Sequence, residues 1–178
     1  MPPAIIGTIG HSTRPLEELL GILEGFGTTH LVDVRTVPRS RHNPQYNRET
    51  LPGALAARGI GYVHEPGLGG LRKPRPDSVN GGWRNASFRG FADHMETAGF
   101  EERLARLIDL SRDGRPVIMC AEAVPWRCHR SLIADALTAQ GVEVRHLLGP
   151  GPERVHTLTP FARVADGRVH YPGVLDGT

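Results

Sequence analysis

Short apolar runs alternate along the chain with longer stretches in which apolar residues recur at helical spacing. Five of the runs have the length and composition of buried strands, and they cover residues 4–9, 30–34, 61–64, 117–120 and 142–148. The stretches between them repeat apolar residues every three or four positions, which predicts helices over residues 15–25, 47–58, 88–97, 100–112 and 129–140. Because strands that alternate with helices pair in parallel through right-handed crossovers, the pattern predicts an α/β fold of three layers with a mainly parallel sheet of about five strands.

The alternation stops at residues 149–152, where the chain reads Gly-Pro-Gly-Pro. Further on, Asp166-Gly167 separates two segments whose residues favour strands, and Asp-Gly at such a position predicts a β-hairpin. We expect residues 1–150 to form an α/β core domain. We expect residues 151–178 to form a tail that holds the hairpin and packs on the core, rather than an independent domain.

Polar residues that carry chemistry follow the first four predicted strands. Since all strands of a parallel sheet point the same way, their ends meet at the carboxyl edge, where ligands bind in folds of this class. We therefore expect a common cleft at this edge, lined by His11 and Ser12 after the first strand, Asp33 and Arg35 after the second, His64 after the third, and Cys120, Glu122 and His129 after the fourth. A purely structural ion pair is the alternative for Asp33 and Arg35.

Both cysteines of the chain lie in residues 116–131, PVIMCAEAVPWRCHRS, which predict a strand, a loop and the start of a helix. The N-terminus of a helix and the cations of Arg127, His129 and Arg130 favour a thiolate. We therefore expect Cys120 to be a thiol of lowered pKa. The candidate catalytic residues are Cys120, Glu122, His129 and His11.

Other roles for these sulfur atoms stay open. A buried and inert thiol is the common fate of a lone cysteine. Cys120, Cys128 and His129 form a metal-binding or redox thiol site in a further interpretation, although they lack the CxxC spacing of common zinc sites.

Arginine is strongly favoured in the segment 35–48, which holds no acidic residue. Planar guanidinium groups suit phosphate and carboxylate, so the pattern indicates a small anionic or nucleotide-like substrate. The candidate binding residues are Ser12, Asp33, Arg35, Arg39, Arg41, His64, Arg127 and Arg130. The alternative function is a non-catalytic module that binds a nucleotide or nucleic acid through residues 35–48.

Residues 65–87 form the longest stretch without a hydrophobic period, and they are rich in Gly, Pro and Arg. Long irregular loops in compact domains are commonly functional or mobile. We expect this segment to be a lid over the cleft, with Trp83 as its apolar contact.

Length, composition and net charge exclude some classes of function. The chain has 178 residues, 39% of them hydrophobic, and a formal net charge of +2, which is ordinary for a globular protein and small for a long nucleic-acid track. No secreted disulfide framework, signal peptide or bilayer-spanning run is recognisable. We expect a cytoplasmic protein without membrane contact, whose first expected partner is a small anionic ligand and whose second is nucleic acid. The cofactor and the oligomeric state stay open.

Several of these motifs together resemble the domain of unknown function 488 (DUF488) family, and they span roughly residues 7–148. The shared segments are TIGHS at 8–12, VDVR at 32–35 with Pro38 and Ser40, YVH at 62–64 with LGG at 68–70, MCAE at 119–122 and CHR at 128–130. The family has no established activity, so the resemblance implies a class and not a reaction.

A weaker resemblance links the chain to rhodanese-like domains, in which an Asp-x-Arg strand precedes a strand that ends in a catalytic cysteine. In those domains an arginine closes an anion-binding loop five or six residues after the cysteine. Here Arg127 follows Cys120 by seven positions, and Pro125-Trp126 stands in place of a small or glycine-rich loop. The sequence thus favours an enzyme with thiol or acid–base chemistry at the carboxyl edge.

Overall fold

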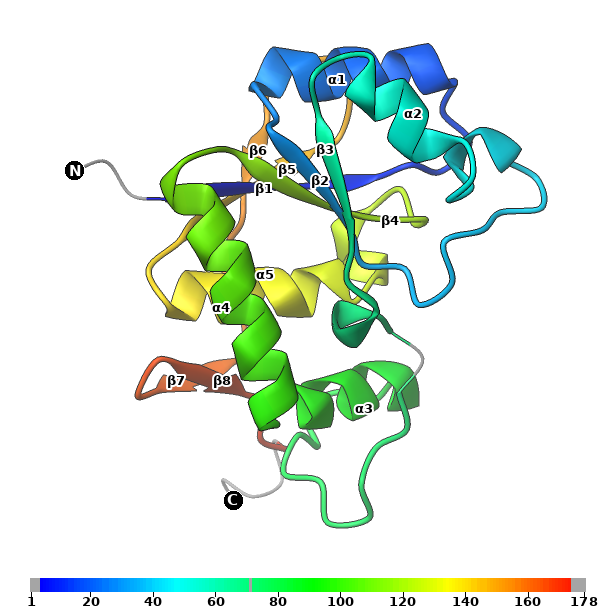
Figure 1. Cartoon of the computed structure of the whole chain (residues 1–178). Coiled ribbons are helices and arrows are strands. Elements are labelled where there is room, and N and C mark those ends of the chain that lie inside the picture. Colours follow the sequence, from blue (N-terminus) through cyan, green and yellow to red (C-terminus); the bar gives the residue numbers. More distant parts are fainter. Residues whose placement is uncertain (1–3, 71, 174–178) are drawn as a thin grey trace.

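A computed structural model describes residues 4–70 and 72–173 of the chain. Position 71 of the predicted lid and positions 174–178 of the predicted tail lie outside the described residues, as do positions 1–3. The centre of the structure is a sheet in the order β3-β2-β4-β1-β5-β6 (Figure 1). Its strands are β1 (Ile5–Gly10), β2 (His30–Asp33), β3 (Gly61–His64), β4 (Pro116–Cys120), β5 (Glu143–Leu147) and β6 (Arg154–Val155). The first five are parallel, and β6 pairs antiparallel with β5.

Helices cover both faces of this sheet, as the predicted three layers require (Figure 1). On one face α1 and α2 pack over one cluster of buried apolar residues, and on the other α3, α4 and α5 pack over a second cluster. Three short 3₁₀ helices, η1, η2 and η3, lie in the loops after β2, β3 and β4. The helices are α1 (Leu16–Phe26), α2 (Leu51–Ala56), α3 (Ala86–His94), α4 (Ala98–Arg112) and α5 (Arg130–Ala139), and the 3₁₀ helices are η1 (Pro44–Tyr46), η2 (Pro66–Leu68) and η3 (Pro125–Arg127).

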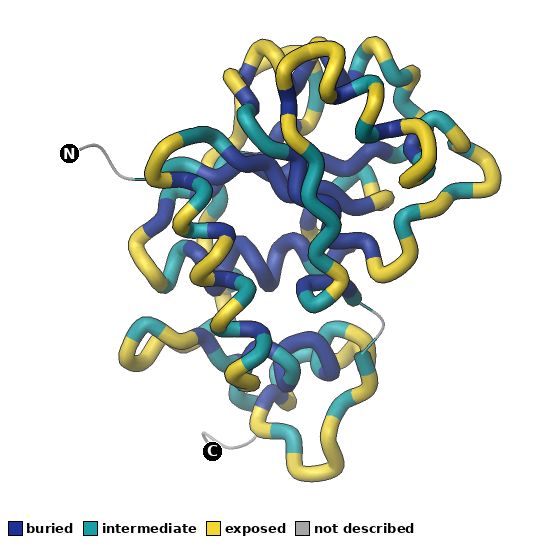
Figure 2. Tube along the Cα trace, viewed as in Figure 1, coloured by how far each residue is buried: buried dark blue, intermediate teal, exposed yellow. Residues whose placement is uncertain are grey.

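The central strand β4 shows why these apolar runs become strands. All five of its residues are buried (Figure 2). Val117 and Met119 contact the α1 and α2 side, whereas Ile118 and Cys120 belong to the opposite cluster. A strand turns successive side chains to opposite faces, so a strand covered on both faces has to be apolar throughout. The same alternation places the Cys120 sulfur on the α5 face.

The predicted hairpin is confirmed in the C-terminal part of the chain. Strands β7 (Arg163–Ala165) and β8 (Arg168–His170) pair antiparallel across Asp166 and Gly167. Both turn residues have positive φ angles, 53° and 75°, as a type I′ turn requires. Tyr171, just after β8, is fully buried in the cluster beneath α5. The chain at the end of the hairpin therefore packs against the core through Tyr171.

The α/β fold with a mainly parallel sheet is confirmed, and beyond shifts at the ends of elements the structure differs from the sequence prediction at β6 and α2. Strand β6 adds a sixth strand that two exposed residues did not signal. The helix predicted over 47–58 begins at Leu51, where Pro52 occupies its first turn, and η1 precedes it. No helix in the described part of the chain is both long and apolar enough to cross a membrane.

Candidate functional site

The carboxyl ends of β1 and β4 lie side by side, as the common-cleft prediction requires. The backbone N–H of His11 donates to the Cys120 carbonyl oxygen at 2.9 Å, and that of Ser12 donates to the Ala121 carbonyl oxygen at 2.9 Å. Glycine is needed at position 10, because an added Cβ would overlap the backbone of Glu122. Close packing of these two strand ends places His11 beside the start of the cysteine loop.

Asp33 and Arg35 form a buried ion pair at the end of β2. The Nη2 and Nε atoms of Arg35 donate to the two Asp33 carboxylate oxygens at 2.7 and 2.9 Å. Tyr62 donates its hydroxyl to Asp33 at 2.6 Å, and Arg35 also donates to the Tyr46 carbonyl oxygen at 2.7 Å. His64 donates from Nε2 to the Arg35 carbonyl oxygen at 2.8 Å. This is the structural ion pair that the sequence left open, and its hydrogen bonds hold the loop after β2 in place.

His11 is buried beside this ion pair and stacks on Tyr46, with ring centroids 4.4 Å apart. Its Nδ1 atom donates to the Ser12 carbonyl oxygen at 2.9 Å, so in the neutral ring Nε2 accepts. The Nη1 atom of Arg35 lies 3.4 Å from that Nε2 atom. Burial lowers the pKa of His11, and the Arg35 cation lowers it further. His11 is therefore a neutral acceptor at the carboxyl edge.

Cys120 and Cys128, which we call the thiol pair, are both buried on the α5 face. Their sulfur atoms lie 2.7 Å apart. The Cys128 sulfur also lies 3.4 Å from His129 Nδ1 and accepts the backbone N–H of Arg130 at 3.5 Å. The Cys128 sulfur thus collects hydrogen bonds from its partner and from the start of α5, which favour its thiolate.

The prediction that Cys120 has the lowered pKa was wrong. Burial raises the pKa of Cys120 well above its ordinary value, and its hydrogen bond to Cys128 raises it further. The hydrogen bond from the Cys120 thiol lowers the pKa of Cys128, and His129 and Arg130 lower it as well. The sequence position at a strand end suggested Cys120, whereas the donors converge on the sulfur eight residues later.

Arg130 supplies the charge that balances this thiolate. Its side chain is fully buried and donates to the carbonyl oxygens of Glu122 and Ala123 at 2.9 and 3.3 Å and to Thr8 Oγ1 at 3.4 Å. Within residues 4–70 and 72–173, no carboxylate oxygen lies within 4.0 Å of its guanidinium group. A buried cation needs a compensating charge, and a thiolate at Cys128, whose pKa Arg130 lowers, can provide it.

Four of the other predicted site residues, Glu122 and three arginines, have exposed side chains. Glu122 is exposed, and its carboxylate accepts the neighbouring backbone N–H of Ala123 at 3.1 Å. Arg39, Arg41 and Arg127 are exposed, and Arg39 lies 3.7 Å from Glu49. These three arginines line the surface near the loops and make no hydrogen bond to the buried groups in the described structure.

Two parts of the predicted lid, residues 65–87, lie in different places. Gly70 lies against the His129 ring, where an added Cβ would come within 3.2 Å of Nδ1. Trp83 instead packs on the aromatic residues of the tail, with its ring centroid 4.8 Å from that of Phe161 and 5.4 Å from that of Tyr171. Opening of this segment as a lid stays a prediction.

A chain of buried polar groups, which we call the polar chain, was not among the predicted site residues. His146 Nδ1 lies 2.7 Å from Thr8 Oγ1, and His146 Nε2 lies 2.8 Å from His156 Nδ1. His156 Nε2 lies 2.8 Å from Asp135 Oδ1, and Tyr171 donates its hydroxyl to Asp135 Oδ2 at 2.8 Å. The one feature of the sequence that could have indicated the polar chain is Asp135, an acid among the apolar residues of α5.

The order of hydrogen bonds fixes the protons along the polar chain. Since the Asp135 carboxylate only accepts, His156 donates to it from Nε2 and accepts at Nδ1 when neutral. His146 then donates from Nε2 and accepts the Thr8 hydroxyl at Nδ1. Burial, the neighbouring His156 and Arg130 together lower the pKa of His146 to about 3. His146 is therefore a neutral ring with both of its nitrogens hydrogen-bonded.

Acid should destabilise the protein through His146. A histidine whose pKa falls from 6.5 in the unfolded chain to about 3 in the folded protein binds more protons when unfolded, so stability falls as the pH drops below 6.5. We expect His146 to contribute a loss of about 2 kcal/mol between about pH 6.5 and pH 5. Urea unfolding of the wild type and of His146→Gln measures this, and equal pH slopes in the two proteins would contradict the assignment.

Within the described residues, no group of three or more His, Cys, Asp and Glu side chains is arranged to hold a metal ion. The polar side chains at the carboxyl edge instead provide a thiol pair, a neutral imidazole and buried arginines.

The family model of the domain of unknown function DUF488 matches residues 15–137. This match covers most of the chain and includes the ion pair after β2 and the thiol pair, so the protein belongs to the DUF488 family. Among curated proteins and solved structures, none matches the chain.

Proposed function

We propose that this DUF488 protein is an enzyme that acts on a small anionic substrate through the thiolate of Cys128. The observation that supports this most is the combination of the Cys128 sulfur, its hydrogen-bond donors and a buried Arg130 without a carboxylate partner in the described structure. Thiolates of lowered pKa next to cations are the usual nucleophiles of cysteine enzymes. A reducing compartment such as the cytoplasm would keep both thiols free.

The groups around Cys128 have distinct roles in such a reaction. The sulfur supplies the electron pair of the new bond, and the leaving group departs with the electrons of the broken bond. His129 Nδ1, 3.4 Å from the sulfur, is placed to deliver the proton that the leaving group needs. Arg127 is exposed on η3 and has no acidic partner within 4.0 Å among the described residues, so it can attract an anion to this loop.

A second candidate function is redox chemistry of the thiol pair, which the 2.7 Å separation of the sulfur atoms favours. With a hydroperoxide as oxidant, Cys128 would take one oxygen and release an alcohol. Cys120 would then displace water and close the disulfide, so that two thiols and one peroxide give a disulfide, an alcohol and water. In this reaction both cysteines are indispensable.

The alternative of a non-catalytic binding module has less support. Of the arginines in residues 35–48, Arg35 is buried and bonded to Asp33, so it is not presented to a long polyanion. Arg39, Arg41 and Arg48 remain exposed on this segment. A module of this kind would depend on these three residues and not on the thiols.

Iodoacetamide labelling as a function of pH tests the proposed function. We expect the wild type to be labelled at Cys128 well below about pH 8.5, the ordinary thiol pKa. Cys128→Ser should lose this phase, because the remaining thiol of Cys120 is the one whose pKa is raised. Cys120→Ala should retain labelling of Cys128 but shift it to higher pH, since the hydrogen bond from Cys120 is lost.

The same variants separate the two chemistries. If the mechanism is nucleophilic, Cys120→Ser should remain active, because serine keeps a hydrogen-bond donor to Cys128. If the mechanism is redox, Cys120→Ser should lose activity as fully as Cys128→Ser does. Mass spectrometry after peroxide treatment would show the loss of two hydrogen atoms only in the redox case. A wild type labelled only above about pH 8.5 would refute both.

A further inference from the structure

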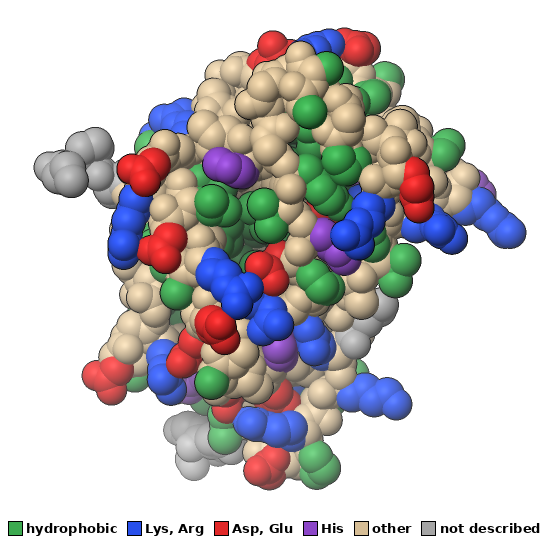
Figure 3. All heavy atoms as spheres, viewed as in Figure 1, with side chains coloured by type: hydrophobic (Ala, Val, Ile, Leu, Met, Phe, Trp, Pro, Cys, Tyr) green, Lys and Arg blue, Asp and Glu red, His purple; other side chains and the backbone are tan. Residues whose placement is uncertain are grey.

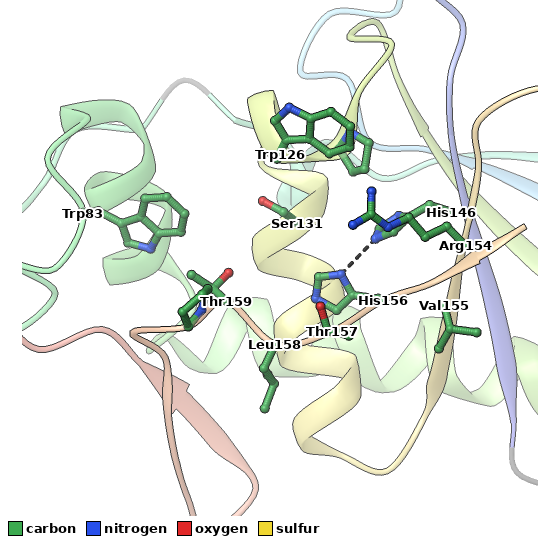
Figure 4. A pocket seen from close by; sticks show the side chains of 12 residues that line it. Trp83, Trp126, Ser131, His146, Arg154, Val155, His156, Thr157, Leu158 and Thr159 are labelled. Carbon is green, nitrogen blue, oxygen red and sulfur yellow. Dashed lines mark hydrogen bonds between the residues drawn. The ribbon is translucent and has the colours of Figure 1, made fainter.

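A cavity of about 350 Å³ lies outside the thiol pair, between α5, η3 and the segment 154–160 that follows β5. We call it the tail cavity (Figure 4). Its volume is within the range of small-molecule sites. The residues that line it are Trp83, Pro125, Trp126, Ser131, His146, Arg154, Val155, His156, Thr157, Leu158, Thr159 and Pro160. Cys120 and Cys128 do not line it.

The rim of the tail cavity exposes apolar surface. Trp126 is 56% exposed, Val155 is 54% exposed and Leu158 is 37% exposed. All three line the same cavity, although large exposed apolar side chains are scattered thinly elsewhere. Exposed apolar side chains gathered around one cavity are typical of ligand sites, and an exposed tryptophan ring offers a flat face for stacking.

Arg154 provides a positive charge at this rim. Its guanidinium carbon lies 5.8 Å from the centroid of the Trp126 ring, and Figure 4 shows it between that ring and the histidine pair. In the described ranges no carboxylate oxygen lies within 4.0 Å of Arg154. A cation together with an exposed aromatic ring is suited to a ligand that combines a planar ring with a negative charge.

The rear wall of the tail cavity is held in place by hydrogen bonds. His146 and His156 are held by the polar chain, with both ring nitrogens of each already bonded. Asp135 also accepts the backbone N–H of Thr159 at 3.0 Å, which fixes the segment of the tail that forms the wall. A ligand therefore finds a preformed site in which Arg154, and not a histidine, meets its charge.

Figure 3 shows one face of the molecule, where basic and acidic side chains are interspersed. The tail cavity differs from this mixed surface, since its lining residues include a cation, two histidines and no acid.

We infer that the tail cavity binds a small aromatic anion, in which a planar ring stacks on Trp126 and a phosphate or carboxylate contacts Arg154. Nucleoside monophosphates and aromatic carboxylates share this chemistry. The inference does not depend on the reactivity of Cys128.

Titration with AMP, with adenosine and with 2-naphthoate tests this inference. We expect AMP or 2-naphthoate to bind with a dissociation constant below about 1 mM by calorimetry. Both tryptophans of the chain line the cavity, so binding of AMP should also change the intrinsic fluorescence. Adenosine, which lacks the charge, should bind at least about tenfold more weakly than AMP if the phosphate form is the ligand.

Variants of exposed residues locate the site without risk to folding. Arg154→Gln should weaken the anionic probes about tenfold or more, and Trp126→Ala should weaken every probe, whereas Trp126→Phe should retain binding. Arg163→Gln on the exposed β7 strand is the matched control and should bind as the wild type does. Cys128→Ser should also bind normally, which separates this inference from the proposed function. Failure of both anionic probes, or equal binding by Arg154→Gln, would overturn it.

Discussion

Asp135→Ala should lower the free energy of unfolding by about 3–5 kcal/mol, the usual cost of breaking a buried charged network. The carboxylate is fully buried and accepts three hydrogen bonds, from His156, the Thr159 N–H and Tyr171. Alanine would leave these buried donors without a partner and open a small cavity. Two of the three donors lie in the segment 154–160 and the third follows β8, so the tail should loosen from α5. Urea unfolding monitored by circular dichroism measures the loss.

Two further variants serve as comparisons for Asp135→Ala. Asp109→Ala removes an acid that is exposed on α4 and pairs with Arg112 at the surface, so it should change stability by less than about 0.5 kcal/mol. Asp135→Asn keeps the shape of the side chain and should cost less than alanine. A loss for Asp135→Ala no larger than that of the control would show that the polar chain does not anchor the tail.

Arg130→Met should raise the pKa of Cys128, which is about 4 in the wild type, by about 2 units and reduce thiol labelling at about pH 4 roughly fiftyfold. Methionine fills much of the same buried space but removes the positive charge that balances the thiolate. The hydrogen bonds to the Glu122 and Ala123 carbonyl oxygens are lost as well, so the loop after β4 should loosen. The pH midpoint of iodoacetamide labelling is the measurement, because a merely structural role would not displace it.

Arg130→Lys is the matched variant, since it keeps the charge without the planar guanidinium group. It should restore most of the low labelling midpoint even if it does not restore all of the stability. If Arg130→Met labels at the same pH as the wild type, then the thiolate is stabilised by Cys120 and His129 alone. Near-ultraviolet circular dichroism would verify that each variant is folded.

The hydrophobic pattern predicted the architecture because it reports burial on two faces. The residues of β3 were predicted as observed, and the other parallel strands differ only at their ends. Strand β6 was missed because two exposed residues carry no period, and its pairing depends on the edge that β5 presents. The late start of α2 has a local cause, since Pro52 suits the first turn of a helix and not its interior.

The sequence predicts which strand ends meet but not the hydrogen bonds that form there. Topology brings the ends of β1, β2 and β4 to one edge, and the sequence contains this information. Which cysteine has the lowered pKa depends on hydrogen-bond donors that converge in three dimensions. The spacing of residues in the sequence does not show this convergence. Asp135, His146 and His156 meet only when the tail returns to α5, so no local motif links them.

The position of strand β1 in the sheet affects how the chain folds during its synthesis. Its two neighbours in the sheet are β4 and β5, with Gly7 opposite Val117 and Ile5 opposite Glu143. A nascent chain therefore carries an apolar strand with no partner until the ribosome has made more than a hundred further residues. Only β2 and β3 find each other early. Such long-range pairing slows folding, and it makes the first strand the segment of the nascent chain that most needs protection by a chaperone.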